Sequence, residues 1–186
     1  MNRHGMTRLP VALALAGFVA IAPALKAADP PADSEQVSQL LSDAKTDAFQ
    51  LKEDAETMHF YSTGNLNWQT HANKINSIRD HVNAVGQHLA KLEELRGEAS
   101  PWQKTAIDRI RPLLKELASN TEAIIEYLNK NPGRLRAPEY KDFLEANADE
   151  SEQLAALIGD FVDYGKTRQR LERLREKLEL PPTGGF

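Results

Sequence analysis

Residues Val37 to Met58, with the sequence VSQLLSDAKTDAFQLKEDAETM, carry apolar side chains at alternating steps of four and three. These side chains belong to Val37, Leu41, Ala44, Ala48, Leu51, Ala55 and Met58. An alternation of this kind has a mean period of about 3.5 residues, which places the side chains in one narrow stripe along a helix. A stripe like this must be covered by other helices.

Three further stretches show the same spacing, and turn-forming residues separate all four. The apolar positions include Trp68, Ile75, Ile78, Val82, Val85, Leu89 and Leu92, then Ile107, Ile110, Leu114, Leu117, Ile124 and Leu128, and last Tyr140, Phe143, Leu144, Leu154, Leu157, Ile158, Phe161 and Val162. Helices are therefore predicted over about 33–60, 67–96, 101–130 and 138–179. Short connections favour antiparallel neighbours. The predicted fold is all-α, an antiparallel up-down-up-down four-helix bundle with a long fourth helix overhanging at its C-terminus.

Signals at the ends of these stretches support the boundaries. Asp33 or Ser34 can cap the first helix, and Ser100-Pro101-Trp102-Gln103 combines an N-cap, proline at the first helical position and a glutamine placed for a capping box. Pro112 lies inside the third helix, where a kink is expected rather than a break. Gly165 lies inside the fourth helix, where a bend or hinge is expected.

The first 27 residues have the form of a secretory signal peptide. Arg3 and Arg8 precede an uncharged run of 14 residues from Leu9 to Ala22, and small residues lead to a favoured cleavage site after Ala27. The alternative is an uncleaved anchor, but the run is short for a membrane span, which needs about 20 apolar residues. We therefore expect a periplasmic or secreted protein without a transmembrane segment, with disordered tails at 28–32 and 181–186.

Composition narrows the function classes. The chain has no cysteine, which excludes disulfides, thiolate zinc sites and covalent haem attachment. Taking the three basic residues of the signal from the 23 in the chain leaves 20 against 27 acidic residues, a charge of −7. An exported acidic chain is a poor candidate for nucleic-acid binding, which needs a basic surface.

Polar residues interrupt the stripes at His71, Thr121, Asn147 and Ser151. Thr121 and Asn147 fall at the same height on consecutive helices, so we expect them to form a hydrogen bond with each other, and a polar notch for a small ligand is the alternative. His71 and Met58 both face inward near one end. This layout resembles that of small exported four-helix cytochromes, and the resemblance implies a haem held by a Met/His pair. No further residue pattern supports it, and a histidine satisfied by a tyrosine hydroxyl is the alternative.

Two other groups of residues are candidate metal ligands. Glu56-Thr57-Met58-His59 has the Glu-x-x-His form used by di-iron bundles, but the second motif that such bundles need is absent. His81 and His88 share a helix face, where weak capture of copper or zinc together with His59 is the alternative to unrelated surface histidines. No catalytic motif is present, so we expect neither an enzyme nor a resident cofactor.

Charge is distributed unevenly along the chain. Residues 29–60 have a balance of −6, whereas residues 166–179 have a balance of +3 with leucines at Leu171, Leu174 and Leu178. This amphipathic basic segment can dock on its own bundle, pair with another copy or meet an anionic surface or partner. The predicted interaction residues are Lys166, Arg168, Arg170, Leu171, Arg173, Leu174, Arg175, Lys177 and Leu178.

A second basic group lies in the connection before the fourth helix, and its members are Lys130, Arg134, Arg136 and Lys141. It is either an anion site at a helix start or a solvated connector. Taken together, the sequence favours a non-enzymatic protein-interaction, structural or chaperone-like factor of the bacterial cell envelope. The alternative is a bundle that binds a small ligand, haem or metal with His71 and its neighbours.

Overall fold

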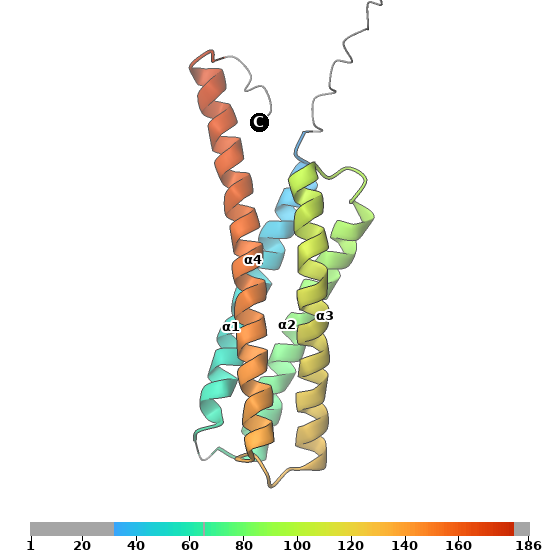
Figure 1. The fold of residues 1–186 in the computed structure, drawn as a ribbon, viewed down its shortest axis with the longest axis vertical. Coiled ribbons are helices and arrows are strands. Elements are labelled where there is room, and N and C mark those ends of the chain that lie inside the picture. Colours follow the sequence, from blue (N-terminus) through green and yellow to red (C-terminus); the bar gives the residue numbers. More distant parts are fainter. Residues whose placement is uncertain (1–31, 65, 181–186) are drawn as a thin grey trace, which may run out of the picture.

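The computed structural model describes residues 32–64 and 66–180. This part of the chain contains four helices: α1 over Glu35–Tyr61, α2 over Trp68–Glu94, α3 over Pro101–Lys130 and α4 over Pro138–Lys177 (Figure 1). The predicted all-α four-helix bundle is confirmed. The predicted signal sequence, all but the last residue of the expected 28–32 tail, and the 181–186 tail lie outside the described residues.

Side-chain caps fix the starts of the first three helices. Ser34 is the N-cap of α1, where its hydroxyl accepts a hydrogen bond from the Val37 N–H over 3.4 Å. Asn67 caps α2 in the same way by accepting from the Thr70 N–H over 2.9 Å. Each cap satisfies a backbone donor that has no partner inside the helix. At the start of α3, the Gln103 side chain accepts from the Ser100 N–H over 2.9 Å, as the capping-box pattern predicts.

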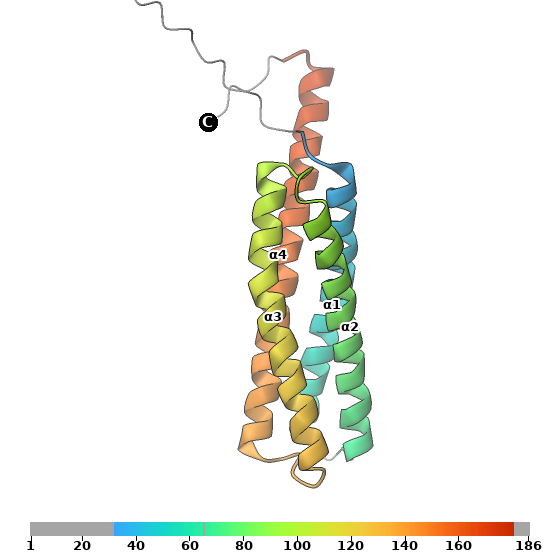
Figure 2. The ribbon, with the colours of Figure 1, turned by 90° about the vertical axis from the view of Figure 1, so that its right-hand side faces the viewer.

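Each helix packs on the neighbours that precede and follow it in the chain, and α4 closes the ring onto α1. Successive helices run in opposite directions (Figure 2). The starts of α1 and α3 and the α2–α3 connection meet at one end of the bundle, and α4 extends well past that end (Figures 1 and 2). The last turns of α4 therefore form an overhang, as the sequence predicts.

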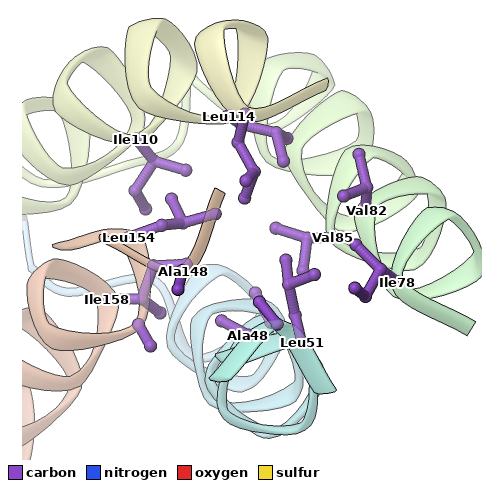
Figure 3. Packing of buried hydrophobic residues seen from close by; sticks show 14 of the residues in the cluster. Ala48, Leu51, Ile78, Val82, Val85, Ile110, Leu114, Ala148, Leu154 and Ile158 are labelled. Atoms are coloured by element: carbon purple, nitrogen blue, oxygen red, sulfur yellow. The ribbon is translucent and has the colours of Figure 1, made fainter. Parts of the chain in front are cut away.

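The four apolar stripes meet along the axis of the bundle, where the side chains interdigitate (Figure 3). Leucine and isoleucine from α3 and α4 face alanine and leucine from α1, with valine and isoleucine from α2 beside them. Removing each large apolar side chain from water contributes about 1.5–3 kcal/mol, so this axis is the main source of stability. The core is uninterrupted from Val37 to Met58 on α1.

Neither Pro112 nor Gly165 breaks its helix. α3 continues through Pro112, as predicted, and α4 runs as one helix through Gly165. Gly165 is buried, and a Cβ built there would lie 2.8 Å from Cη2 of Trp102 on α3. Close approach of the indole therefore explains this glycine without a hinge.

A helix can cross a membrane only if it is both long and apolar enough. Among the described residues, none of the four helices combines the length and the apolar character that crossing a membrane requires.

Candidate functional site

The overhang of α4 presents apolar side chains that nothing in the described chain covers. Leu171, Leu174 and Leu178 are 52%, 45% and 61% exposed. A single exposed leucine is ordinary, but three on successive turns of one helix form a continuous apolar patch. In this structure the overhang does not lie back on its own bundle, which was one of the three arrangements considered for it (Figure 1).

One ion pair joins the base of the overhang to the bundle. Arg168 on α4 donates to the Asp33 carboxylate over 3.2 Å, and the Trp102 indole N–H donates to the same oxygen over 2.6 Å. Farther out, Arg175 is buried and bonds to Glu172 over 3.3 Å. The other predicted basic residues are exposed, namely Lys166, Arg170, Arg173 and Lys177.

A surface cavity of about 370 Å³ lies between α3 and α4, just before the overhang begins. Its lining includes the aromatic rings of Trp102, Phe161 and Tyr164. Trp102 meets Tyr164 edge-on with ring centroids 5.4 Å apart, and the Arg109 guanidinium lies 5.6 Å from the centroid of Phe161. Tyr164 is 50% exposed, so this cavity is an aromatic hollow open to solvent.

The hollow and the overhang belong to one stripe on α4. Leu157, Tyr164, Leu171 and Leu178 recur at intervals of seven residues. Seven residues are close to two helical turns, so these side chains share one face, and such a repeat is typical of a helix that pairs with another helix. The spacing along the sequence places Leu157 and Phe161 in the core, but both are only partly buried, so the outer stripe is not apparent from the sequence.

His71 occupies the opposite end of the bundle and is 1% exposed. Its Nδ1 lies 3.0 Å from the Tyr140 hydroxyl, so the predicted tyrosine partner is confirmed. Burial raises the pKa of Tyr140, which keeps the hydroxyl protonated. Since a buried hydroxyl without an acceptor is costly, the Tyr140 O–H donates to Nδ1, and the ring proton of the neutral imidazole resides on Nε2.

A second surface cavity, of about 590 Å³, opens beside His71. The α1–α2 and α3–α4 connections and the start of α2 form its walls. Its lining includes Tyr61, Trp68, His71, Arg134, Leu135 and Arg136. Two of the four residues in the predicted basic loop thus border this cavity, whereas the other two, Lys130 and Lys141, are not part of its lining, and Lys130 pairs with Glu126 on its own helix.

The predicted metal-ligand residues do not converge. Within residues 32–64 and 66–180, no three histidine or acidic side chains form a cluster that can hold a metal ion. Glu56 is exposed and pairs with Lys52 over 3.5 Å, while Met58 is buried in the core. His59, on the same helix, is only partly buried and lies in its last turn.

His81 and His88 are partly buried, and each faces an acid on α1. His88 Nε2 lies 2.9 Å from an Asp47 oxygen, and His81 Nε2 lies 3.7 Å from an Asp54 oxygen. The sequence predicts that both histidines lie on the surface, unrelated to each other, or capture a metal weakly with His59. The structure makes them parts of separate α1–α2 contacts instead.

Comparison with protein-family models, with characterised proteins and with solved structures finds no match to this chain. The function must therefore be argued from the site geometry alone.

Proposed function

We propose that this protein is a non-enzymatic helical bundle of the bacterial cell envelope that works by binding another protein helix along the outer stripe of α4. The observation that carries the proposal is the seven-residue repeat of Leu157, Tyr164, Leu171 and Leu178. The last three are exposed, and Leu157 is partly buried beside the hollow. A heptad repeat is stabilised by a second helix that inserts its side chains between these positions. The signal-like residues 1–27 support export to the envelope.

Charge around the stripe supports a helical partner over a lipid surface. A membrane-surface helix carries its basic residues beside the apolar face and its acids elsewhere. Here Arg170, Arg173 and Lys177, each one position before a leucine, lie about 100° to one side of the stripe. Glu172 and Glu179, each one position after a leucine, lie about 100° to the other side, so acids also border the apolar face. The protein as a whole is acidic, so an anionic bilayer would repel the bundle behind the overhang.

A pair of matched triple variants tests this proposal. Leu171→Ser, Leu174→Ser and Leu178→Ser remove the apolar stripe, while Arg170→Ser, Arg173→Ser and Lys177→Ser change the neighbouring face at the same spacing. Each tagged protein is recovered from envelope fractions after mild cross-linking, and bound proteins are identified. The proposal expects a specific partner that the leucine variant loses and the basic-face variant keeps. Equal recovery by both variants, or liposome binding that only the basic-face variant loses, contradicts it.

A second candidate function, binding of a small ligand, is supported by the cavity beside His71. Neutral His71 presents an N–H donor at Nε2, Trp68 supplies an aromatic wall, and Arg134 supplies a cation that has no ion-pair partner among the described residues. These groups suit a small anion such as a carboxylate or phosphate ester.

Calorimetric titration tests this candidate with inorganic phosphate and citrate as probes. Saturable binding that His71→Gln and Arg134→Gln both weaken supports it, with Lys141→Gln as the control outside the cavity. Absence of heat with either probe, together with no Soret band after incubation with haem, removes it.

A further inference from the structure

We propose that the occupant of the outer stripe is a second copy of this chain, with two α4 helices paired antiparallel around a twofold axis between Thr167 and Arg168. This inference rests on the proposed function, because it names the partner helix. It rests on the symmetry of the stripe, which a surface that binds an unrelated protein would not need to have. The stripe is complementary to itself when one copy is reversed.

The stripe has two halves of equal length, 157–164 and 171–178, of which the first borders a hollow and the second projects into solvent. Leu157 and Leu178 are centred on the same midpoint as Tyr164 and Leu171, between residues 167 and 168. Reversal about this point brings Leu178 opposite Leu157 and Leu171 opposite Tyr164 of the other copy. The first half borders a hollow of about 370 Å³, and the second half presents exposed leucines. Projecting side chains of each copy thus meet the hollow of the other, as an isologous interface requires.

Charge favours the antiparallel direction over the parallel one. The segment 157–164 contains Asp160, which is unpaired among the described residues, Asp163, which pairs with Lys45 on α1 over 3.0 Å, and no basic residue. The segment 166–179 has a balance of +3. Parallel pairing would set the two basic segments side by side. Antiparallel pairing sets each basic segment against an acidic one.

Asp160 is the acidic residue most directly involved in the preference for antiparallel pairing. It lines the hollow and has no ion-pair partner among the described residues. Reversal places it beside the end of the overhang that carries Arg173, Arg175 and Lys177.

The residues nearest the proposed axis are compatible with a close approach. Thr167 is an uncharged residue whose hydroxyl donates to the Asp163 carbonyl oxygen over 2.8 Å. Two Arg168 side chains would repel each other there, but each is paired with Asp33 of its own copy over 3.2 Å. The Asp33 carboxylate therefore offsets the like charge at the centre of the interface.

Solution mass is the first test, measured by light scattering and sedimentation over a wide concentration range with the chain from residue 28 to 186. The inference expects twice the single-chain mass. It also expects the Leu171→Ser, Leu174→Ser, Leu178→Ser variant to dissociate at least about tenfold more readily, which corresponds to 1.4 kcal/mol or more. The variant carrying Arg170→Ser, Arg173→Ser and Lys177→Ser should keep the wild-type mass. Circular dichroism melts check that each variant is folded.

Disulfide trapping tests the direction, and the absence of cysteine from the chain allows single probes. A mixture of Tyr164→Cys and Leu171→Cys proteins should form a mixed disulfide under mild oxidation. Leu178→Cys alone should not cross-link, because its two copies would lie about 30 Å apart along the helices, far beyond the reach of a disulfide. Arg173→Cys, which lies about 100° to the side of the leucines, is the control. Efficient cross-linking of Leu178→Cys to itself indicates parallel pairing and overturns the inference.

The outcomes separate this inference from the proposed function. A single-chain mass at every concentration, together with leucine-dependent capture of a different protein, overturns the second-copy inference and leaves the proposed function standing. A single-chain mass without any leucine-dependent partner overturns both. A dimer that the leucine variant retains overturns the second-copy inference, because the stripe is then not the contact between copies, and the capture experiment still decides the proposed function.

Discussion

The side-chain amide of Asn147 on α4 donates a hydrogen bond to the Thr121 hydroxyl on α3 over 2.9 Å in the middle of the buried seam. Thr121 in turn donates to the Leu117 carbonyl oxygen over 2.8 Å. The predicted pairing of these two residues is therefore confirmed. Asn147 Oδ1 is buried without a hydrogen-bond partner among the described residues, so the pair carries an uncompensated polar atom.

Replacement of Asn147 with leucine should leave the melting temperature unchanged or raise it. The substitution removes an unsatisfied acceptor and adds apolar volume, while Thr121 keeps its bond to the backbone. Thermal unfolding followed by circular dichroism measures the effect. Thr121→Val is the matched comparison and should lower the stability by about 1–3 kcal/mol, because it leaves the Asn147 amide without an acceptor. A loss of several kcal/mol for Asn147→Leu would show that the Asn147 amide contributes more stability than its unpaired oxygen costs.

Gly165→Ala should destabilise the protein, although alanine is the better helix former by about 1 kcal/mol. The added Cβ would lie 2.8 Å from Cη2 and 3.1 Å from Cζ2 of Trp102, so the indole or the helix must move. Overpacking of this kind costs about 1–3 kcal/mol. Gly86→Ala is the control in α2, where nothing lies within 4 Å of the new Cβ, and it should stabilise the protein. Urea denaturation that shows equal shifts for both variants would refute this explanation of Gly165.

Much of the fold follows from local sequence signals. The 3-4 spacing gives the helices and their buried faces, and the Ser100-Pro101-Gln103 pattern gives the start of α3, because both depend on residues within a few positions of each other. The pairing of Thr121 with Asn147 followed from equal heights on neighbouring antiparallel helices. Such reasoning needs only the rise per residue.

Contacts that depend on how the helices rotate against one another were not predictable in this way. The role of Gly165 depends on Trp102, which is 63 positions earlier in the chain. Leu157 and Phe161 fit a core stripe and an outer stripe equally well by spacing, and only the position of α3 places them at the edge of a hollow. His81 and His88 appeared to be surface residues because Asp54 and Asp47 lie on a different helix.

The stability of the bundle should decrease as the pH is lowered through the range in which histidines titrate. Burial lowers the pKa of His71 below its ordinary value of about 6.5, so the unfolded state binds the proton more tightly than the folded state does. The free energy of unfolding therefore falls as the pH drops below about 6.5. Denaturation at about pH 7.5 and pH 5 should show a smaller difference for His71→Gln than for the wild type. An equal difference in the two proteins would show that His71 does not contribute.

Gln103 joins the starts of α1 and α3 and should be among the most sensitive polar residues of the bundle. It is fully buried, and its Oε1 accepts from the N–H groups of Ser34 over 3.0 Å and Ser100 over 2.9 Å. Its Nε2 donates to the Ser34 carbonyl oxygen over 2.8 Å and to the Ser38 hydroxyl over 3.0 Å. The N–H groups of Ser34 and Ser100 depend on Gln103, whereas the Ser34 carbonyl oxygen also accepts from the hydroxyl and the N–H of Ser38, each over 3.0 Å.

Gln103→Leu should therefore lower the free energy of unfolding by about 2–4 kcal/mol, because it leaves the N–H groups of Ser34 and Ser100 without their acceptor. Gln103→Glu keeps the two accepted bonds but sets a carboxylate against the Ser34 carbonyl, so its cost should be smaller at acidic pH, where the added carboxyl can donate. Gln69→Leu, at an exposed position in the first turn of α2, is the control and should change the stability by less than about 0.5 kcal/mol. Similar losses for Gln69→Leu and Gln103→Leu in chemical denaturation would show that the four bonds add nothing beyond the helix propensity of glutamine.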